Sequence, residues 1–223
     1  MAVLGVDGWR GRWVGALLTG RRVRLLVLDD MAAVLAVPDV DVIAIDMPIG
    51  LSDDGVRDCD LAAKKLLGRA GSSVFQTPVR AVLKARDYAE ARDLSRACTT
   101  PPRAPSAQAF QLVKAIRQLD DALGDPPSER IVEVHPELAF RAIDRRVTDP
   151  KVTARGTVQR LAALRTVMDV EQALADAPRL VPMVDAMDAC AAAWSARRIS
   201  EGSGECVGAG TTDARGRPMR ICW

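Results

Sequence analysis

The first 46 residues alternate short apolar runs with tight turns, and this pattern restricts the fold more than any other feature of the chain. Short apolar runs bounded by turn signals predict consecutive β-strands. The segment 31–37 has the composition of a short helix, which Asp30 can cap at its start. The predicted strands of this region are residues 2–7, 12–18, 23–28 and 41–46. The region therefore predicts three strands, one helix and a fourth strand.

The rest of the chain changes to helical spacing. Residues 55–125 are rich in alanine, leucine, lysine and arginine and predict a helical insertion. A fifth strand is predicted over 130–134, followed by helices over 156–176 and 184–200. Strands alternating with helices favour an α/β fold, a mixed five-stranded sheet flanked by helices on both faces. We expect a single domain over 1–223 that contains this insertion, because a chain of this length can bury a substantial core.

Composition narrows the function classes. The start of the chain lacks a basic segment followed by an apolar one, and no run approaches the roughly 18 apolar residues of a membrane span. We therefore expect a cytoplasmic protein with no membrane partner. Five cysteines are scattered without a CxxC pair, which argues against a zinc ribbon. A net charge of +2 is too small to indicate a nucleic-acid partner by itself.

Two aspartates stand at the ends of predicted strands. Asp7 closes the first apolar run directly before Gly8, and Asp46 closes the run IAID before the turn MPIG. Strand ends line the ligand crevice in open α/β sheets, and a carboxylate ending an apolar strand is costly to bury unless it is paired or bound to a cation. Aspartate also begins many ordinary turns. Because both residues occupy the same kind of position, we interpret them as site residues.

Two further acids lie near the start of the last predicted helix. Asp185 and Asp188 are three residues apart and share one face of that helix. An acid in a first turn is also an ordinary complement to the helix dipole, and this explanation suffices for Asp185. Small residues suited to close packing against a sheet follow Asp188, namely Ala189, Ala192, Ala193 and Ala196. Such packing would bring the Asp188 carboxylate toward the strand ends.

The segment VEVHPELAF adds Glu133 on the fifth strand, with His135 and Glu137 at its exit. A lone histidine is more often a structural residue than a ligand, and for His135 the two interpretations are evenly balanced. Glu137 can simply occupy the first turn of a helix after Pro136, a favourable place for an acid. The residue types leave both interpretations open.

Converging carboxylates raise one another's pKa unless a cation neutralises them. Ligand sets made only of oxygen suit Mg²⁺ or Mn²⁺. Two such ions about 3.5–4 Å apart can activate water and stabilise the leaving oxygen in phosphodiester cleavage. We therefore predict Asp7, Asp46 and Asp188 as metal ligands and catalytic residues, with Asp7 bridging the ions and Glu133 or Asp185 as auxiliary catalytic residues.

Basic residues gather in the segment 141–165. They are Arg141, Arg145, Arg146, Lys151, Arg155, Arg160 and Arg165. A phosphate backbone is attracted to such a face, although charged helices are usually just solvated. We predict Lys151 and Arg155 as substrate contacts. Neither a GxxxxGK[ST] phosphate loop nor a GxSxG nucleophile turn occurs in the chain.

Several motifs occur together in a recognisable order. They are GVDGWRGRWVGALL, IAIDMPIGL, the RxCD of Arg57 to Asp60, SSVFQTPVR, SAQAF, EVHPELAF and DAMDACAAAW. With them the chain resembles, over nearly its whole length, the family of predicted RNase H-like nucleases known as domain of unknown function 429. The expected order of strands and helices is also that of the RNase H fold.

The resemblance implies an RNase H-like fold and a metal-dependent nuclease. It places Asp7 and Asp46 as the acids of the first and fourth strands, and Asp185 or Asp188 as the acid of the final helix. Substrate contacts are predicted from the PVR and EVHPE segments at Arg80, His135 and Glu137. Two departures concern the family's lysine pair, reduced here to Lys151, and its acid pair before the last helix, where Val184 precedes Asp185.

The leading hypothesis is a Mg²⁺- or Mn²⁺-dependent nuclease that hydrolyses phosphodiester bonds, with a nucleic acid or nucleotide phosphodiester as its partner. The main enzymatic alternative is an ATP-dependent phosphotransferase or ATPase of the same superfold, which the missing phosphate loops disfavour. A non-catalytic binding protein that keeps the fold is the third alternative. A homodimer is compatible with all three.

Overall fold

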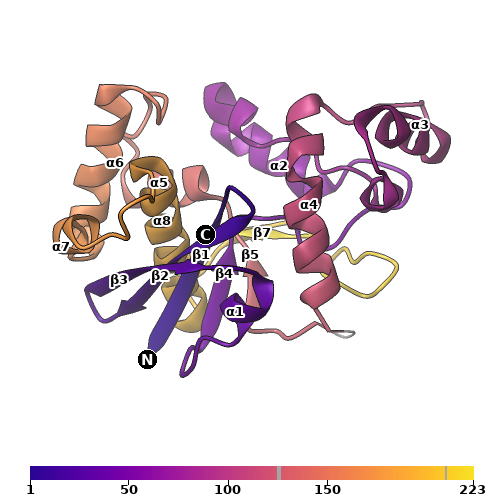
Figure 1. Ribbon diagram of the computed structural model, residues 1–223. Coiled ribbons are helices and arrows are strands. Elements are labelled where there is room, and N and C mark those ends of the chain that lie inside the picture. The colour runs from indigo at the N-terminus through magenta and orange to yellow at the C-terminus, as the bar shows by residue number, and fades with distance from the viewer. Residues whose placement is uncertain (125–126, 209) are drawn as a thin grey trace. The chain divides into compact units, whose positions relative to one another are not determined.

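A five-stranded sheet forms the centre of the fold in the computed structural model, which describes residues 1–124, 127–208 and 210–223. The spatial order of the strands is β3-β2-β1-β4-β5 (Figure 1). β1, β2 and β3 pair antiparallel, whereas β4 and β5 continue the sheet in parallel with β1. The strands are β1 (Ala2–Trp9), β2 (Arg12–Thr19), β3 (Arg22–Leu28), β4 (Val42–Ile45) and β5 (Ile131–Glu133). The predicted mixed five-stranded sheet is confirmed.

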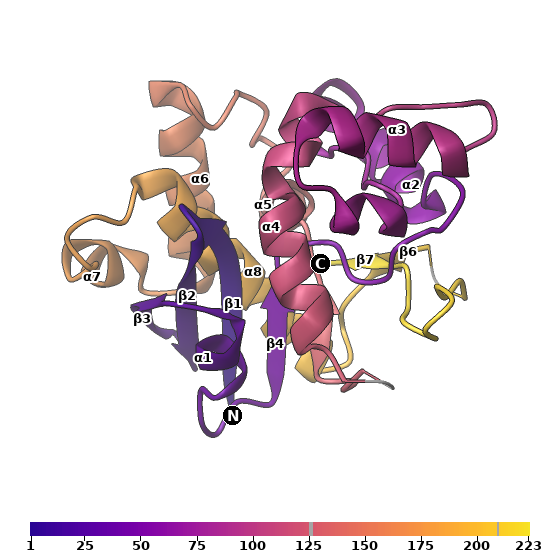
Figure 2. The same cartoon turned by 45° about the vertical axis from the view of Figure 1, so that its right-hand side comes forward.

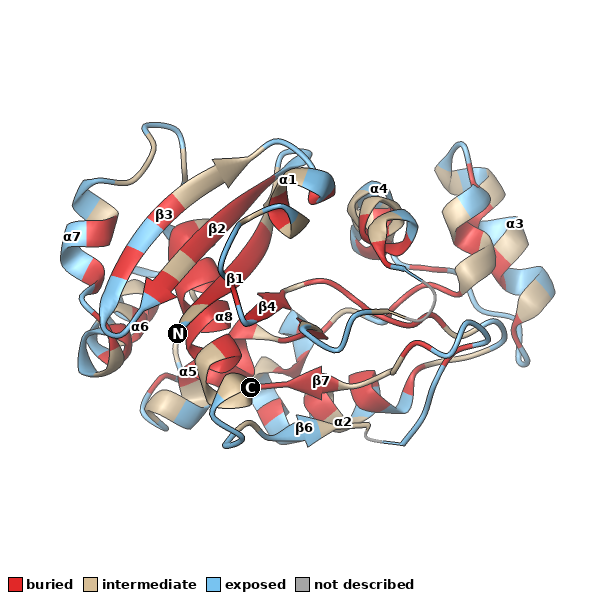
Figure 3. Cartoon of the chain, turned by 90° about the horizontal axis from the view of Figure 1, so that it is seen from below, coloured by how far each residue is buried: buried red, intermediate tan, exposed pale blue. Residues whose placement is uncertain are grey.

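Helices cover both faces of this sheet. The short helix α1 (Met31–Leu35) begins where the Asp30 side chain accepts a hydrogen bond from the Ala33 amide at 2.8 Å. The long helix α8 (Met183–Ser200) packs against β1, β2 and β4. Figure 3 shows α1 and α8 on opposite sides of the strands. The prediction of an α/β sheet flanked by helices is therefore confirmed, in a layout consistent with an RNase H-like fold.

Three further helices pack around α8. Figure 2 shows α6 and α7 together with α8 behind the strands. These helices are α5 (Pro136–Ile143), α6 (Ala154–Val167) and α7 (Val170–Ala175). The single helix predicted over 156–176 is wrong, because Asp169 leaves the helical path and its amide donates to the Arg21 carbonyl at 2.8 Å. The Arg21 guanidinium also donates to the carbonyl of Arg165, which fixes the end of α6.

Contacts divide the chain into two units. The first unit holds the five-stranded sheet and comprises Met1–Met47, Glu129–Glu205 and Cys222–Trp223. The second unit comprises Pro48–Ser128 and Cys206–Ile221. The predicted insertion, 55–125, falls in the second unit, and its last residue lies outside the described residues.

The second unit is mainly helical, as the alanine- and leucine-rich pattern predicts. Its elements are α2 (Asp58–Leu67), the 3₁₀ segments η1 (Gly68–Ser73) and η2 (Arg80–Lys84), α3 (Tyr88–Cys98) and α4 (Ala107–Ala122). Val79, Val82, Ala91 and Val113 form a buried apolar cluster there. Near the end of the chain, β6 (Cys206–Val207) and β7 (Ile221–Cys222) form a separate two-stranded sheet. No helix within the described ranges has both the length and the apolar character to cross a membrane.

Candidate active site at the ends of the first and fourth strands

The parallel pairing of β1 and β4 places Asp7 and Asp46 at the same level of the sheet. Val6 lies opposite Ile45, and the Asp46 amide donates to the Val6 carbonyl at 2.9 Å. Asp7 is 9% exposed and Asp46 is partly buried. Two carboxyl groups from strands 39 residues apart in the chain are thus neighbours at one end of the sheet.

The absence of a side chain at Gly5 allows α8 to approach that end closely. A Cβ atom at Gly5 would lie 2.0 Å from the Ala193 nitrogen and 2.2 Å from the Ala189 carbonyl oxygen. Side chains alternate along a strand, so Asp7 lies on the same face as Gly5, the face that α8 covers. The helix meets Gly5 with Ala189 and Ala193, and its preceding turn carries Asp188 and Asp185 toward Asp7.

The electrostatics of this cluster show how closely the acids interact. Burial raises the pKa of Asp7 well above its ordinary value, and the neighbouring carboxylate of Asp46 raises it further. Smaller contributions to the pKa of Asp7 come from Asp188 and Asp185. Burial, followed by the charge of Asp188, raises the pKa of Asp46 to about 7. These acids therefore resist being charged together unless a cation joins them.

Lys151 supplies part of the missing positive charge. Its Nζ donates to Oδ2 of Asp188 at 2.6 Å, and the Lys151 side chain is 40% exposed whereas that of Asp188 is 2% exposed. Although burial opposes it, attraction to Asp188, Asp46 and Asp7 raises the pKa of Lys151. The other oxygen, Oδ1 of Asp188, is buried without a hydrogen-bond partner among the described residues. One lysine thus faces a cluster of four acids and leaves a buried carboxylate oxygen unused.

Asp185 lies at the outer side of the cluster. It is partly exposed, and burial still raises its pKa. Lys151 and Arg10 lower that pKa, as does a hydrogen bond between the carboxyl groups of Asp185 and Asp7. The structure therefore brings together Asp7, Asp46, Asp185 and Asp188, the four aspartates that the sequence selects.

Glu133 lies on the other face of the sheet. It pairs with Ile45 and not with Asp46, and in a parallel pair residues at the same level point to the same face. Asp46 follows Ile45 directly, so its side chain points to the opposite face of the sheet, on which Asp7 also lies. The register thus places Glu133 on the opposite face of the sheet from Asp7 and Asp46.

His135 and Glu137 mark the start of α5. His135 Nδ1 accepts a hydrogen bond from the Glu137 amide at 3.2 Å and caps the helix. The buried Glu137 carboxylate forms a bidentate pair with Arg160, with Nη2 to the two carboxylate oxygens at 2.8 and 2.7 Å. His135 lowers the pKa of Asp188 and Glu137 raises it, so both lie near the cluster. The helix cap of His135 and the pair of Glu137 with Arg160 are structural contacts.

The remaining predicted substrate contacts lie elsewhere. Arg155 on α6 is exposed and lies 3.7 Å from Asp149. Arg80 belongs to the second unit, where its Nη1 donates to both Asp120 oxygens at 3.1 and 3.0 Å and its Nη2 donates to Asp213. The basic segment 141–165 is also largely paired, since Arg146 and Arg160 bind Asp144 and Glu137. These pairs reduce the charge available to a phosphate backbone.

Sequence reasoning missed Arg10, which lies near Asp185 in the turn between β1 and β2. Its φ of 49° places it in the left-handed region, and glycine follows it. The signal was available in the motif GWRG, because the turn between the two strands consists of Arg10 and Gly11 alone and keeps Arg10 close to the strand that carries Asp7. Arg10 therefore belongs among the candidate site residues.

The donor set is suited to a hard divalent ion in its chemistry. All of its donors are carboxylate oxygens, and the buried Oδ1 of Asp188 without a partner is the kind of atom that a cation would satisfy. As the side chains lie, no group of three or more His, Cys, Asp or Glu residues in the described part of the chain is arranged to hold a metal ion. In this arrangement Lys151 pairs with Asp188 and neutralises part of the negative charge.

Comparison with known families gives one match. The family described as "Protein of unknown function (DUF429)" matches residues 5–213. No curated protein and no solved structure matches the chain. The matched range contains the four aspartates and Lys151, and the family description states no activity.

Proposed function

Because the chain belongs to the DUF429 family, whose description states no activity, we propose from the site itself that it is a divalent-metal-dependent phosphodiesterase, a nuclease in its wider sense. Two observations carry this proposal: Asp7, Asp46 and Asp188 lie close enough to raise one another's pKa, and Oδ1 of Asp188 is buried without a hydrogen-bond partner among the described residues. A structural acid cluster would be expected to have its oxygens satisfied.

In this proposal the side chains divide the work. Asp7, Asp46 and Asp188 hold Mg²⁺ or Mn²⁺, and Asp185 orients Asp7 through their hydrogen bond. Two such ions, when bound, would activate water and stabilise the leaving oxygen. Hydrolysis adds water across one phosphorus–oxygen bond and yields a phosphate monoester and an alcohol.

Lys151 has two alternative partners in this scheme. Without metal it neutralises Asp188 at 2.6 Å. If Asp188 held a divalent ion instead, the partly exposed ammonium group of Lys151 would be available to bind a substrate phosphate. Lys151 would thus exchange its pairing with Asp188 for a contact with the substrate phosphate when the metal site is occupied. The 40% exposure of the Lys151 side chain supports its predicted role as a substrate contact.

The proposal is tested by assaying bis(p-nitrophenyl) phosphate, single- and double-stranded DNA, and RNA with Mn²⁺, Mg²⁺ or EDTA. We expect cleavage of at least one substrate with metal and none with EDTA. Asp7→Asn should lower the rate by at least about a hundredfold while keeping the fold. The matched control is Asp29→Asn, an exposed acid paired with Arg12, which should retain the rate.

Thermal unfolding distinguishes the alternatives. Mn²⁺ alone should raise the melting temperature of the proposed enzyme, whereas a phosphotransferase should need nucleotide together with metal. A binding protein that uses neither ligand should show no change with either of them. Equal metal-dependent cleavage by Asp7→Asn and the unaltered protein would refute the assignment of the site.

A further inference from the structure

The second unit contains a cavity of about 740 Å³. This volume lies in the range of roughly 300–1,000 Å³ that is typical of small-molecule sites. Its walls come from α2, η1, the segment 74–79, the end of α3 and the start of α4. None of the four clustered aspartates lines it.

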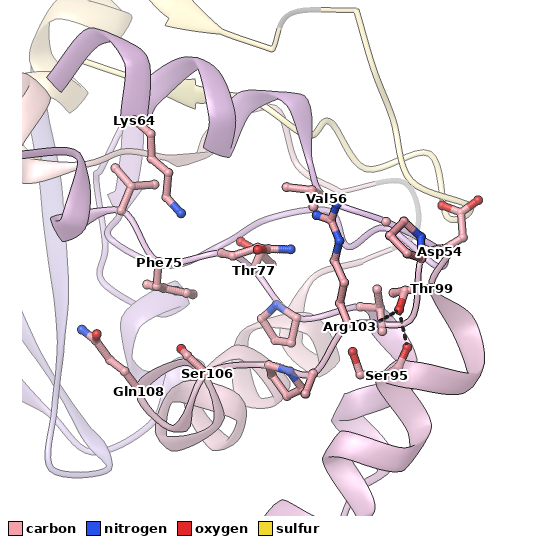
Figure 4. A pocket seen from close by; sticks show the side chains of 18 of the residues that line it. Asp54, Val56, Lys64, Phe75, Thr77, Ser95, Thr99, Arg103, Ser106 and Gln108 are labelled. Atoms are coloured by element: carbon pink, nitrogen blue, oxygen red, sulfur yellow. Dashed lines mark hydrogen bonds between the residues drawn. The ribbon is translucent and has the colours of Figure 1, made fainter. Parts of the chain in front are cut away.

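Two cationic side chains enter the cavity from different elements. Figure 4 shows Lys64 extending from α2 and Arg103 from the segment that precedes α4. Neither forms an ion pair within the described part of the chain. One acid, Asp54, also lines the cavity, so the two cations leave a surplus of positive charge. This charge favours an anionic ligand.

The backbone around Arg103 is fixed by hydrogen bonds. The Thr99 hydroxyl donates to the Ser95 carbonyl at 2.9 Å and accepts from the Arg103 amide at 2.8 Å. On the opposite wall, η1 approaches the Lys64 backbone so closely that a Cβ atom at Gly71 would lie 2.8 Å from the Lys64 carbonyl oxygen. Both cations are therefore carried by well-packed backbone.

The start of α4 adds partial positive charge. Ser106 caps this 16-residue helix by accepting a hydrogen bond from the Ala109 amide at 3.1 Å, and Ser106 and Gln108 line the cavity. Amides in the first turn of a helix carry partial positive charge and favour anions. A phosphate group would thus find donors from both side chains and backbone.

Thr77 provides an independent indication of a ligand. It lines the cavity and is only 4% exposed, and its Oγ1 has no hydrogen-bond partner among the described residues. Its own amide is held by Oδ2 of Asp60 at 3.0 Å, so the residue is fixed in place. A buried hydroxyl without a partner is costly, and a bound ligand would satisfy it.

Phe75 gives the cavity an apolar surface beside these polar groups. Its ring is partly buried and lies between Lys64 and the start of α4 in Figure 4. Aromatic faces bind planar rings by stacking. We propose that this cavity binds a small organic phosphate with a planar ring, of the size of a nucleoside monophosphate. Lys64, Arg103 and the first turn of α4 bind the phosphate, Phe75 contacts the ring, and the Thr77 hydroxyl forms a hydrogen bond with the ligand.

The proposal is tested by calorimetric titration of the full-length protein with AMP in EDTA. Chelation matters because the acid cluster of the first unit repels phosphate when no metal is present. AMP should bind, inorganic phosphate should displace it, and adenosine should bind at least about tenfold more weakly. No AMP binding, or equal binding of adenosine, would overturn the proposal.

Matched variants locate the site. Lys64→Gln and Arg103→Gln should each weaken AMP binding by about tenfold. Lys65→Gln removes the same charge from the next residue of α2, which is exposed and does not line the cavity, and should leave binding within about twofold. Similar weakening in all three variants would show nonspecific attraction and contradict the assignment.

Thr77→Val tests the hydroxyl separately. It should weaken AMP binding and raise the melting temperature of the free protein, because it removes a buried oxygen without a partner. Unchanged affinity would exclude the hydroxyl from the site and contradict the proposal. Cleavage assays and the Asp7→Asn variant are not involved, so this result is independent of the proposed phosphodiesterase activity.

Discussion

Each unit of the molecule contains a cluster of acids, and the two clusters are neutralised in opposite ways. In the second unit Asp120 and Asp213 are bound by the arginines Arg80, Arg215 and Arg217. In the first unit four aspartates have Lys151 as their hydrogen-bonded cation. Acids that are each paired with arginines are typical of a structural network. Acids that outnumber their cations are typical of a functional site that binds a further cation.

The pKa of Asp213 and the pKa values of the acids in the first unit are shifted in opposite directions. Although burial opposes it, hydrogen bonds from the amides of Arg217, Leu51 and Arg215 hold the pKa of Asp213 below its ordinary value. Burial and neighbouring acids raise the pKa of Asp7 and Asp46. The pKa of a clustered acid therefore depends less on the number of acids nearby than on whether hydrogen-bond donors surround its carboxylate.

The largest expected change in the free energy of unfolding follows the loss of a carboxylate from the arginine-bound cluster of the second unit. Asp120→Ala removes an acid that contacts three arginines, one of which, Arg217, has a side chain only 1% exposed. Removing one partner of a buried ion pair costs about 3–5 kcal/mol. Urea unfolding should show a loss of this size. A loss below about 1 kcal/mol would contradict the conclusion that the acids of the second unit are more strongly paired than those of the first.

In the cluster of four aspartates, by contrast, we expect the loss of a carboxylate to stabilise the protein. Asp46→Asn removes a charge that the metal-free protein tolerates poorly at pH 8, so it should raise the free energy of unfolding by roughly 1–3 kcal/mol. The measurement is urea unfolding in EDTA. Destabilisation by Asp46→Asn under these conditions would show that its carboxylate is well accommodated.

The pH dependence follows from the same carboxyl group. Its pKa is about 7 in the folded protein and 3.8 for the ordinary group, so between these values the folded state binds the proton more strongly. The free energy of unfolding of the metal-free protein should therefore fall as pH rises from about 4 to 7, by up to about 1.4 kcal/mol per pH unit for one group. Asp46→Asn should flatten this slope, whereas Asp29→Asn should leave it unchanged.

A smaller effect is expected when the lysine of the first cluster is removed. Lys151→Met should cost roughly 1–2 kcal/mol in EDTA, because the pair with Asp188 is lost but is partly exposed. Mn²⁺ should recover this stability if the metal takes the place of the lysine. The unfolding midpoints with EDTA and with Mn²⁺ measure both quantities. Failure of Mn²⁺ to stabilise the variant would contradict the proposed exchange.

The smallest effect is expected at Arg155. Its side chain is 83% exposed and lies 3.7 Å from Asp149, so Arg155→Gln should change the free energy of unfolding by less than about 0.5 kcal/mol. The same variant tests its predicted substrate contact, because any loss of nucleic-acid cleavage would then arise from binding and not from folding. Unaltered cleavage would remove Arg155 from the predicted contacts.

Local patterns were sufficient to predict most of the sheet. Apolar runs separated by turns predict β1 to β4, and strand ends carrying Asp7 and Asp46 predict their approach, because neighbouring parallel strands end at the same edge. The small residues of α8 likewise indicate the close packing that brings Asp188 nearby. These features depend on periodicity within single elements, which a sequence displays directly.

Other features depend on contacts between distant segments. The face of Glu133 is decided by one position of register between β4 and β5, and nothing local to VEVHPE fixes that register. The break between α6 and α7 depends on Arg21, and the role of Arg80 depends on Asp120 and Asp213. The catalytic, metal-binding and substrate-binding roles, together with the cytoplasmic location, stay predictions.

Gly5 gives the proposed chemistry a dependence on a residue that has no functional group. A methyl group at this position would collide with the backbone of α8, 2.0 Å from the Ala193 nitrogen. The helix would have to move outward and would carry Asp185 and Asp188 with it. The spacing of the acids is therefore controlled by core packing two residues away from Asp7, and a substitution that alters no charge would disturb the proposed site.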